Sequence, residues 1–331
     1  MKLDIEQIKS ITHGAVEISV ENGKFCFSRF TKNEADVILN ANLSYTAGIQ
    51  MEFKTDGDKL NLTVNTKDET TVRSYFAFDV FVDGILKGSI CNLKDEDCKG
   101  NYAEAVYELG KFLKNFELGN GEKSVRIVFP HSVRAEIEEL EIENATYVAP
   151  LKREKKIVFY GDSITQGYDA LHPSKTYAMR LADAMDAEII NKGIGGAAFN
   201  PELGHVSKVE NADCVIVAYG TNDWTCTGLD VIKSSASGFL TNLEKNYPSC
   251  LIYVIAPIWR KDHETDRVGG KFRDVEQMLE DLCANYKNLK FISGWNLVPH
   301  DEALFGDLSL HPNDKGFGYY CENLLKHIRG N

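Results

Sequence analysis

The hydrophobic pattern of this 331-residue chain changes its period near residue 150. Before that point, apolar and polar residues alternate over short runs such as Val16–Val20, Leu60–Val64 and Val125–Phe129. An alternation of period two is typical of half-buried β-strands. After that point, short apolar runs alternate with helical patterns, which indicates βαβ units and a parallel sheet. We therefore expect two domains of different class, over residues 1–150 and 151–331.

The first domain is predicted to be an antiparallel β-sandwich. The aromatic and β-branched run Tyr75–Val82 is followed by Asp83-Gly84 and then by Ile85-Leu86, a sequence typical of a β-hairpin. The segment Val133–Ile142 is compatible with a strand or a helix. Many short strands without long helices favour a sandwich of the jelly-roll type.

The second domain begins with the short buried strand Lys155–Gly161. Four further strands are expected at Glu188–Asn191, Cys214–Tyr219, Leu251–Ala256 and Lys290–Ile292. Helical patterns lie near residues 177–186, 229–246, 268–286 and 315–328. In open α/β sheets, ligands bind beyond the carboxyl ends of the strands, so candidate functional residues are sought there.

The charge balance weighs against two classes of partner. The chain holds 37 Lys and Arg against 49 Asp and Glu, a formal net charge of −12. Nucleic acids and anionic membranes are bound through basic surfaces, so neither is an expected partner. No run approaches the ~18 consecutive apolar residues of a membrane-spanning helix. The N-terminal segment Met1–Gln7 lacks the apolar run of a signal peptide, so we expect a cytoplasmic protein.

The eight cysteines include no C-x-x-C pair, and several lie in apolar runs such as Asp213–Val217. Without an export signal, we expect reduced and mostly buried thiols. The sequence contains no H-E-x-x-H motif and no cysteine cluster, so we expect neither a metal site nor a cofactor.

Four segments at predicted strand ends or before the last helix carry polar residues or glycines: Gly161–Gly167, Asn191–Gly196, Gly220–Trp224 and Asp307–Asn313. Each alone is compatible with an ordinary turn or helix cap. Together they fit a serine hydrolase. Ser163 is the candidate nucleophile, and the neutral imidazole of His311 is its candidate base. The backbone N–H groups of Ser163 and of the Gly195-Gly196 loop, with the Asn222 amide, could stabilise an oxyanion.

These segments resemble the four blocks of the SGNH, or GDSL-type, hydrolases, in the same order. The resemblance covers about residues 155–331. It implies a three-layer, flavodoxin-like α/β/α fold and ester hydrolysis without a metal. It also implies Ser163 as nucleophile, His311 as base, Gly196 as backbone donor and Asn222 as side-chain donor.

One departure concerns the residue that orients His311. The family places its catalytic Asp three residues before the His, where this chain has Leu308. Asp307 lies one residue further back, so either Asp307 reaches the imidazole through a different loop or a backbone carbonyl replaces it. We favour Asp307.

A β-sandwich before an SGNH domain is similar to carbohydrate esterase family 2, which implies acetylated sugars as substrates. We therefore expect a serine esterase acting on short-chain acyl esters of small molecules or oligosaccharides, with O-acetyl groups favoured. Trp224 and Trp259 could form an aromatic wall for a sugar, or could simply pack. A thioesterase or short-chain lipase with the same machinery is an alternative. A carbohydrate-binding protein with a degenerate hydrolase domain is a non-enzymatic alternative.

Overall fold

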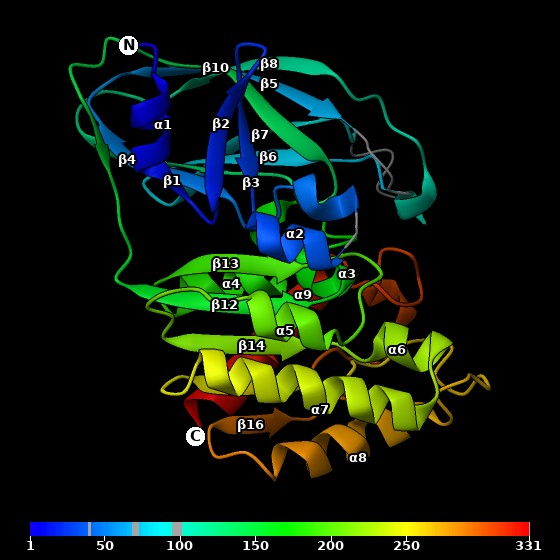
Figure 1. The fold of residues 1–331 in the computed structure, drawn as a ribbon. Helices are drawn as coiled ribbons and strands as arrows, with labels where there is room; N and C mark the ends of the chain where they lie inside the picture. The colour runs from blue at the N-terminus through cyan, green and yellow to red at the C-terminus, as the bar shows by residue number, and fades with distance from the viewer. Residues whose placement is uncertain (39–40, 68–72, 95–100, 331) are drawn as a thin grey trace.

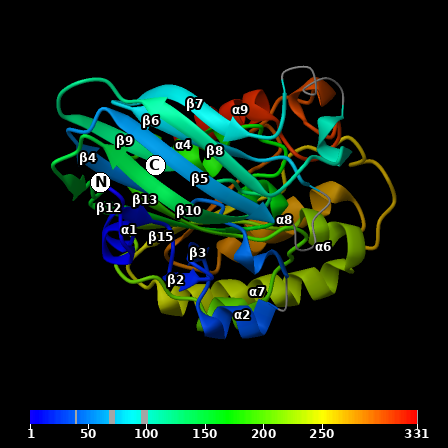
Figure 2. The ribbon, with the colours of Figure 1, turned by 90° about the horizontal axis from the view of Figure 1, so that it is seen from above.

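The computed structural model describes residues 1–38, 41–67, 73–94 and 101–330. Two antiparallel sheets formed by the N-terminal part lie above a parallel sheet with helices on both faces (Figure 1). The view from above shows the N-terminal strands lying across the parallel sheet (Figure 2). This arrangement confirms the predicted fold class of both parts.

The strands of the N-terminal part are β1 (Thr12–His13), β2 (Glu17–Glu21), β3 (Lys24–Ser28), β4 (Gln50–Thr55), β5 (Lys59–Lys67), β6 (Ala77–Val82), β7 (Ile85–Cys91), β8 (Lys111–Glu117), β9 (Lys123–Val128), β10 (Arg134–Glu143) and β11 (Val148–Pro150). One sheet has the order β1-β4-β9-β6-β7, with β11 paired to β4, and the other has the order β2-β3-β10-β5-β8. The ambiguous segment 133–142 is thus mainly strand. Apolar side chains of both sheets form one buried core, as expected for a sandwich.

The predicted hairpin is confirmed, because β6 and β7 pair antiparallel around Asp83-Gly84. Both turn residues have positive φ, 49° at Asp83 and 76° at Gly84, as a two-residue type I′ turn requires. Short helices that we did not predict also occur in this part: α1 (Ile5–Ile11), α2 (Lys32–Ile38), η1 (Ala41–Ser44) and η2 (Tyr102–Glu104). They are too short for helical periodicity to stand out in the sequence.

The parallel sheet has the order β13-β12-β14-β15-β16. Its strands are β12 (Lys155–Gly161), β13 (Ala187–Gly193), β14 (Cys214–Ala218), β15 (Leu251–Ile255) and β16 (Leu289–Ile292). The helices are α3 (Ser163–Gln166), η3 (Pro173–Lys175), α4 (Tyr177–Ala184), α5 (Pro201–Val206), α6 (Thr221–Cys226), α7 (Leu229–Asn246), α8 (Phe272–Cys283), η4 (Glu302–Leu304) and α9 (Asp314–Arg329). In chain order this is the flavodoxin-like 2-1-3-4-5 arrangement. The boundary near residue 150 stays our proposal, placed between the end of β11 and the start of β12.

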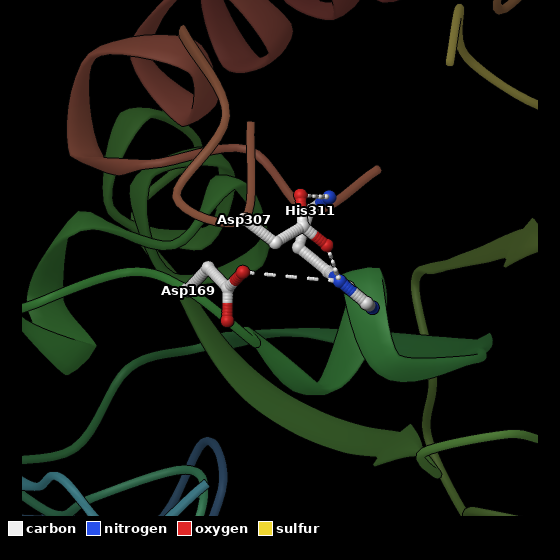
Figure 3. Close-up of side chains that lie close together, drawn as sticks. All are labelled: Asp169, Asp307 and His311. Atoms are coloured by element: carbon white, nitrogen blue, oxygen red, sulfur yellow. Dashed lines mark hydrogen bonds and ion pairs between the residues drawn. The ribbon is translucent and has the colours of Figure 1, made fainter. Parts of the chain in front are cut away.

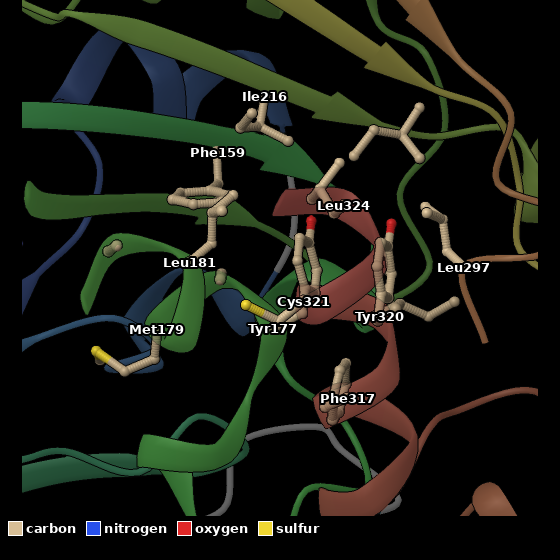
Figure 4. Close-up of a cluster of buried hydrophobic side chains, with 14 of the residues drawn as sticks. Phe159, Tyr177, Met179, Leu181, Ile216, Leu297, Phe317, Tyr320, Cys321 and Leu324 are labelled. Carbon is tan, nitrogen blue, oxygen red and sulfur yellow. The ribbon is translucent and has the colours of Figure 1, made fainter. Parts of the chain in front are cut away.

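Each face of the parallel sheet has its own core. On one face, side chains of α4 and α9 pack on the sheet; Tyr177 and Tyr320 stack with ring centroids 4.2 Å apart (Figure 4). On the other face, α7 and α8 contribute the buried side chains. The described cysteines are free thiols: Cys26, Cys214, Cys283 and Cys321 are buried and Cys250 is partly buried, whereas Cys91 and Cys226 are exposed, contrary to expectation. Cys98 lies outside the described residues.

The register of the parallel sheet brings three strand ends together. Gly161 at the end of β12 pairs with Gly193 of β13 on one side and with Ala218 of β14 on the other. Strands β13 and β14 lie on opposite sides of β12. The strand order therefore reverses at β12, and such a topological switch point is where ligands bind in open α/β sheets. The segments carrying Ser163, Gly196 and Asn222 therefore leave the sheet at one edge. Among the described helices, none is both long and apolar enough to cross a membrane.

Candidate active site

Ser163 is held in a tight turn between β12 and α3. The Asp162 carboxylate caps the short helix by accepting the Ile164 N–H at 2.9 Å, and this hydrogen bond braces the turn. Gly161 allows the helix to approach, because a Cβ there would lie only 2.0 Å from Thr165 Oγ1. Ser163 itself is 5% exposed. The turn therefore presents one hydroxyl at the edge of the sheet and encloses the remaining polar groups.

His311 lies directly against this hydroxyl. Ser163 Oγ is 2.7 Å from His311 Nε2, and His311 Nδ1 is 2.7 Å from Asp307 Oδ2. With a proton on Nδ1, the imidazole donates to the carboxylate and Nε2 accepts the serine proton. The three residues form a continuous hydrogen-bonded chain from a hydroxyl to a carboxylate, which is the geometry of an activated nucleophile.

Asp307, and not a backbone carbonyl, faces Nδ1 in this structure. The extra residue is accommodated by Leu308, whose φ of +58° turns the chain and leaves its side chain in solvent. Asp307 Oδ1 accepts the N–H groups of Ser309, Leu310 and His311 at 2.9, 2.7 and 3.1 Å. The carboxylate therefore organises the loop that carries His311.

Burial opposes ionisation of Asp307, but the hydrogen bond and positive charge of His311, with the backbone N–H groups, outweigh it and hold the pKa below its usual value. The opposite holds at Asp162, where burial raises the carboxyl pKa to about 7. Of these two carboxyl groups beside the turn, one is thus kept ionised and the other is held near neutrality.

A second carboxylate, which sequence reasoning did not identify, also faces the imidazole. Asp169 Oδ2 lies 3.8 Å from His311 Nδ1, and the side chains of Asp169, Asp307 and His311 converge in Figure 3. One ligand atom of each lies within 4.8 Å of the others, a spacing that could suit a metal ion. However, the Arg73 guanidinium hydrogen-bonds to Asp169 at 2.8 Å, so a fixed cation already borders this cluster. No sequence motif links Arg73, which precedes β6, to Asp169, which follows α3.

The candidate oxyanion donors Ser163, Gly196 and Asn222 lie in three segments, and the Gly195–Ala197 segment is hydrogen-bonded to the other two. Gly196 has a φ of +76°, and the neighbouring Gly195 N–H donates to Gln166 Oε1 at 2.8 Å. Asn222 is the second residue of α6 and donates through Nδ2 to the Ala197 carbonyl at 2.9 Å. An amide carries two N–H donors, so this bond can orient Asn222 while leaving its other hydrogen for a ligand. Whether Ser163, Gly196 and Asn222 act as donors stays a prediction.

Residues of the N-terminal part form hydrogen bonds and an ion pair with β13, the strand that leads into the Gly195-Gly196 loop. The buried Arg29 guanidinium donates to the carbonyls of Asn191 and Gly193 at 2.8 and 2.9 Å. Lys192 on the same strand is also buried and lies 2.9 Å from Glu34 of α2. Burial lowers the pKa of Arg29 to about 9, and both cations depend on these polar partners.

The two candidate tryptophans, Trp224 and Trp259, are both packed against other side chains. Trp224 is 0% exposed, donates its indole N–H to the Gly270 carbonyl at 2.8 Å and packs edge-on against Phe272. Trp259 is 8% exposed and stacks on His300 with ring centroids 5.4 Å apart. Trp224 therefore offers no face to a sugar, contrary to the substrate-wall hypothesis, because α6 turns its ring into the core. Trp259 exposes only a small part of its ring, which is too little for a sugar to stack on.

A parallel sheet with a Ser–His–Asp chain at its switch point defines a class of α/β serine hydrolases. Residues 159–318 match the model of the GDSL-like Lipase/Acylhydrolase family. This match confirms the predicted resemblance to the GDSL-type hydrolases. No curated protein sequence matches the chain.

Solved structures with the same fold span nearly the whole chain. A salicylyl-acyltransferase from a tetracycline biosynthetic pathway has a TM-score of 0.76 at 18% identity, over 96% of this chain and 94% of that one. A putative GDSL-like lipase from Bacteroides ovatus has a TM-score of 0.75 at 19% identity, over 98% and 96%. A family two carbohydrate esterase from Clostridium thermocellum has a TM-score of 0.64 at 15% identity, over 86% and 93%. These likenesses establish a shared two-part fold.

Proposed function

We propose that the protein is a serine esterase that hydrolyses short-chain acyl esters, with O-acetyl groups on carbohydrate as the favoured substrates. The observation that carries this proposal is the hydrogen-bonded chain from Ser163 Oγ through His311 to Asp307, with both distances at 2.7 Å. A serine hydroxyl is a weak nucleophile, and an adjacent base with a fixed tautomer is what activates it.

The reaction would proceed in two balanced halves. Ser163 Oγ attacks the ester carbonyl while its proton passes to His311 Nε2, and the alcohol leaves with that proton. Water then attacks the acyl-serine, gives a proton to His311 and releases the acid as Ser163 recovers its own. The Ser163 and Gly196 N–H groups and the Asn222 amide would stabilise the oxyanion in both halves.

Two observations favour a small acyl group on a carbohydrate. Ser163 is 5% exposed, so only a small part of this residue is accessible to a ligand. The fold is shared with a family two carbohydrate esterase whose structure was solved with cellohexaose. Esters of other small molecules belong to the same proposed substrate class. Acyl thioesters and short-chain lipid esters are the alternative substrates for the same catalytic residues.

The test combines a covalent probe with a substrate screen. A fluorophosphonate should label wild-type protein at Ser163, and acetate release from acetylated oligosaccharides should exceed hydrolysis of octanoyl esters or acyl thioesters. Ser163→Ala should remain folded and lose labelling and hydrolysis. Absence of labelling, with folded protein, would favour a carbohydrate-binding protein without activity. Higher kcat/KM on octanoyl than on acetyl esters would overturn the short-chain assignment.

A further inference from the structure

We infer that Arg73 of the N-terminal sandwich is a positioning residue of the active site: it holds Asp169 as a second carboxylate at His311 and balances its charge. The inference rests on the proposed function, since it concerns the same Ser163–His311 pair. It gives the N-terminal part an indirect role in catalysis, exerted through Asp169, although that part contains none of the residues proposed to react.

The contacts of Arg73 are those of an oriented guanidinium. Nε donates to Asp169 Oδ1 at 2.8 Å, and Nη2 lies 3.4 Å from Asp169 Oδ2. The same Nη2 is 3.8 Å from Asp307 Oδ2, the atom that accepts from His311. Both members of the Arg73–Asp169 pair are buried. A buried charge is retained at such a position only when it is paired and hydrogen-bonded.

Further groups of the N-terminal domain hold Asp169 in place. The Tyr75 hydroxyl accepts the Asp169 N–H at 2.7 Å and lies 3.1 Å from Asp169 Oδ1. The Tyr102 hydroxyl donates to the Asp169 carbonyl. Asp169 has a φ of +70°, a conformation that costs a non-glycine residue energy and persists where the surroundings enforce it. Gly306 allows the close approach, because a Cβ there would lie 2.6 Å from Asp169 Cβ.

The charges of Asp307, Asp169 and the His311 imidazolium sum to zero only when the positive charge of Arg73 is included. The imidazole faces Asp307 and Asp169, and Arg73 lies behind both carboxylates. The Tyr168 ring packs against the imidazole with centroids 5.7 Å apart, and the Arg73 guanidinium carbon lies 5.8 Å from the centroid of the same Tyr168 ring. The Asp162 carboxyl, next to Ser163 in the chain, also interacts electrostatically with His311. Two carboxylates and one guanidinium sum to one negative charge, which matches the imidazolium formed during proton transfer.

This arrangement predicts opposite consequences for the two partners. Without Arg73, two negative charges face His311, so the imidazolium is favoured before the reaction and the base is protonated to higher pH. Without Asp169, the guanidinium opposes the imidazolium, so the neutral imidazole persists to lower pH. Burial raises the pKa of Asp169, while the positive charges of His311 and Arg73 oppose that rise.

The experiment measures the pH dependence of Ser163 labelling by a fluorophosphonate, alongside kcat/KM on an ester. Labelling forms the Oγ–P bond, expels fluoride and passes the serine proton to His311, so it reports activation of the nucleophile without a known substrate. The acidic limb is the part of the pH profile in which labelling falls because His311 becomes protonated. In Arg73→Gln the midpoint of this limb should move to higher pH by about 0.5–1 unit, and in Asp169→Asn it should move to lower pH by about as much. The double variant should return to within about 0.3 unit of wild type.

Arg153→Gln is the matched control. Arg153 also links the N-terminal part to the parallel-sheet part, through Glu52 at 2.7 Å and Asp183 at 2.9 Å, and neither of these partners belongs to the proposed catalytic residues. It should lower thermal stability without moving the acidic limb, and Arg73→Lys should restore much of the limb position by restoring the charge. Unchanged limbs, or shifts of the same sign in Arg73→Gln and Asp169→Asn, would overturn the inference. Labelling without hydrolysis of any ester would instead contradict the proposed function.

Discussion

Asp307 Oδ2 lies 2.7 Å from His311 Nδ1 even though the two residues are four positions apart instead of the three expected for this family. In an extended segment, a one-residue shift would turn the carboxylate to the opposite face. The left-handed conformation of Leu308, with φ at +58°, absorbs the additional residue and returns the carboxylate to the imidazole. The same chemistry is therefore reached through a different loop.

Asp307→Asn should lower kcat by about 10³–10⁴, the scale seen when a triad acid is neutralised and the histidine tautomer is lost. The three backbone N–H groups that Asp307 Oδ1 accepts can be retained by the asparagine oxygen, so the loop should survive. Steady-state kinetics with circular dichroism checks this. A loss below about tenfold in a folded variant would contradict an essential Asp307 and favour a dyad oriented by another acceptor.

Leu308→Gly should keep activity and raise the free energy of unfolding by about 0.5–1 kcal/mol, because glycine adopts positive φ without steric cost. The Leu308 side chain is 39% exposed, so little packing is lost. Leu308→Val, with a β-branched side chain in the same conformation, should instead destabilise the loop and reduce kcat. Urea unfolding of the two variants gives the comparison. Equal destabilisation by glycine and valine would contradict this account.

Asn222→Ala should lower kcat by about 10²–10³ with little change in KM, if its amide stabilises the oxyanion only in the transition state. Asn242→Ala is a matched control, because its amide also donates to a backbone carbonyl, that of Pro201 at 3.0 Å, in the α5–α7 contact. The control should lose stability without a loss in kcat. A pure KM effect at Asn222 would place this residue in substrate binding.

Sequence patterns were sufficient where local chemistry determines the structure. The period-two runs became strands, Asp83-Gly84 became a hairpin turn, and Ser163 and His311 were brought together from segments 148 positions apart. That last contact was predictable because both segments leave the same edge of a sheet whose topology the strand–helix alternation implies.

The contacts between domains could not be predicted in this way. Arg73 and Asp169 are 96 positions apart, and neither lies in a recognisable motif. Trp224 follows a strand end, as a substrate-facing residue would, yet α6 rotates its ring into the core. Both outcomes depend on the rotation of a particular turn and on how two domains dock, which local propensity and hydrophobic period do not encode.

Activity should survive extensive treatment with a chelator. The one cluster of potential ligands among the described residues is Asp169, Asp307 and His311, and its atoms are already bonded to Arg73 and to one another. A divalent cation would have to displace the hydrogen bond that fixes the His311 tautomer. Ester hydrolysis before and after dialysis against EDTA is the measurement. Loss of activity with recovery on adding metal would contradict the metal-independent mechanism.

Relative to wild type, the free energy of unfolding of Asp162→Asn should increase as pH rises, so that the advantage of the variant is smallest at acidic pH and largest at alkaline pH. In the native state burial raises the Asp162 pKa from 3.8 to about 7, so between these values the native state binds more protons than the unfolded state. The free energy of unfolding of wild type therefore falls as pH rises through this window, and the loss is complete above pH ~7. Asparagine does not titrate, and its oxygen can still accept the Ile164 N–H.

The measurement is urea unfolding of both proteins from pH 4 to pH 8. The stability difference in favour of Asp162→Asn should grow across this range by on the order of 2–4 kcal/mol, since one pKa unit corresponds to about 1.4 kcal/mol. Asp301→Asn is the control: Asp301 caps η4 in the same way, accepting the Ala303 N–H at 3.0 Å, but it is exposed to solvent. The stability difference of this control should change less with pH than that of Asp162→Asn, because the Asp301 side chain is exposed to solvent. A flat profile for Asp162→Asn would mean that burial does not hold this carboxyl near neutrality.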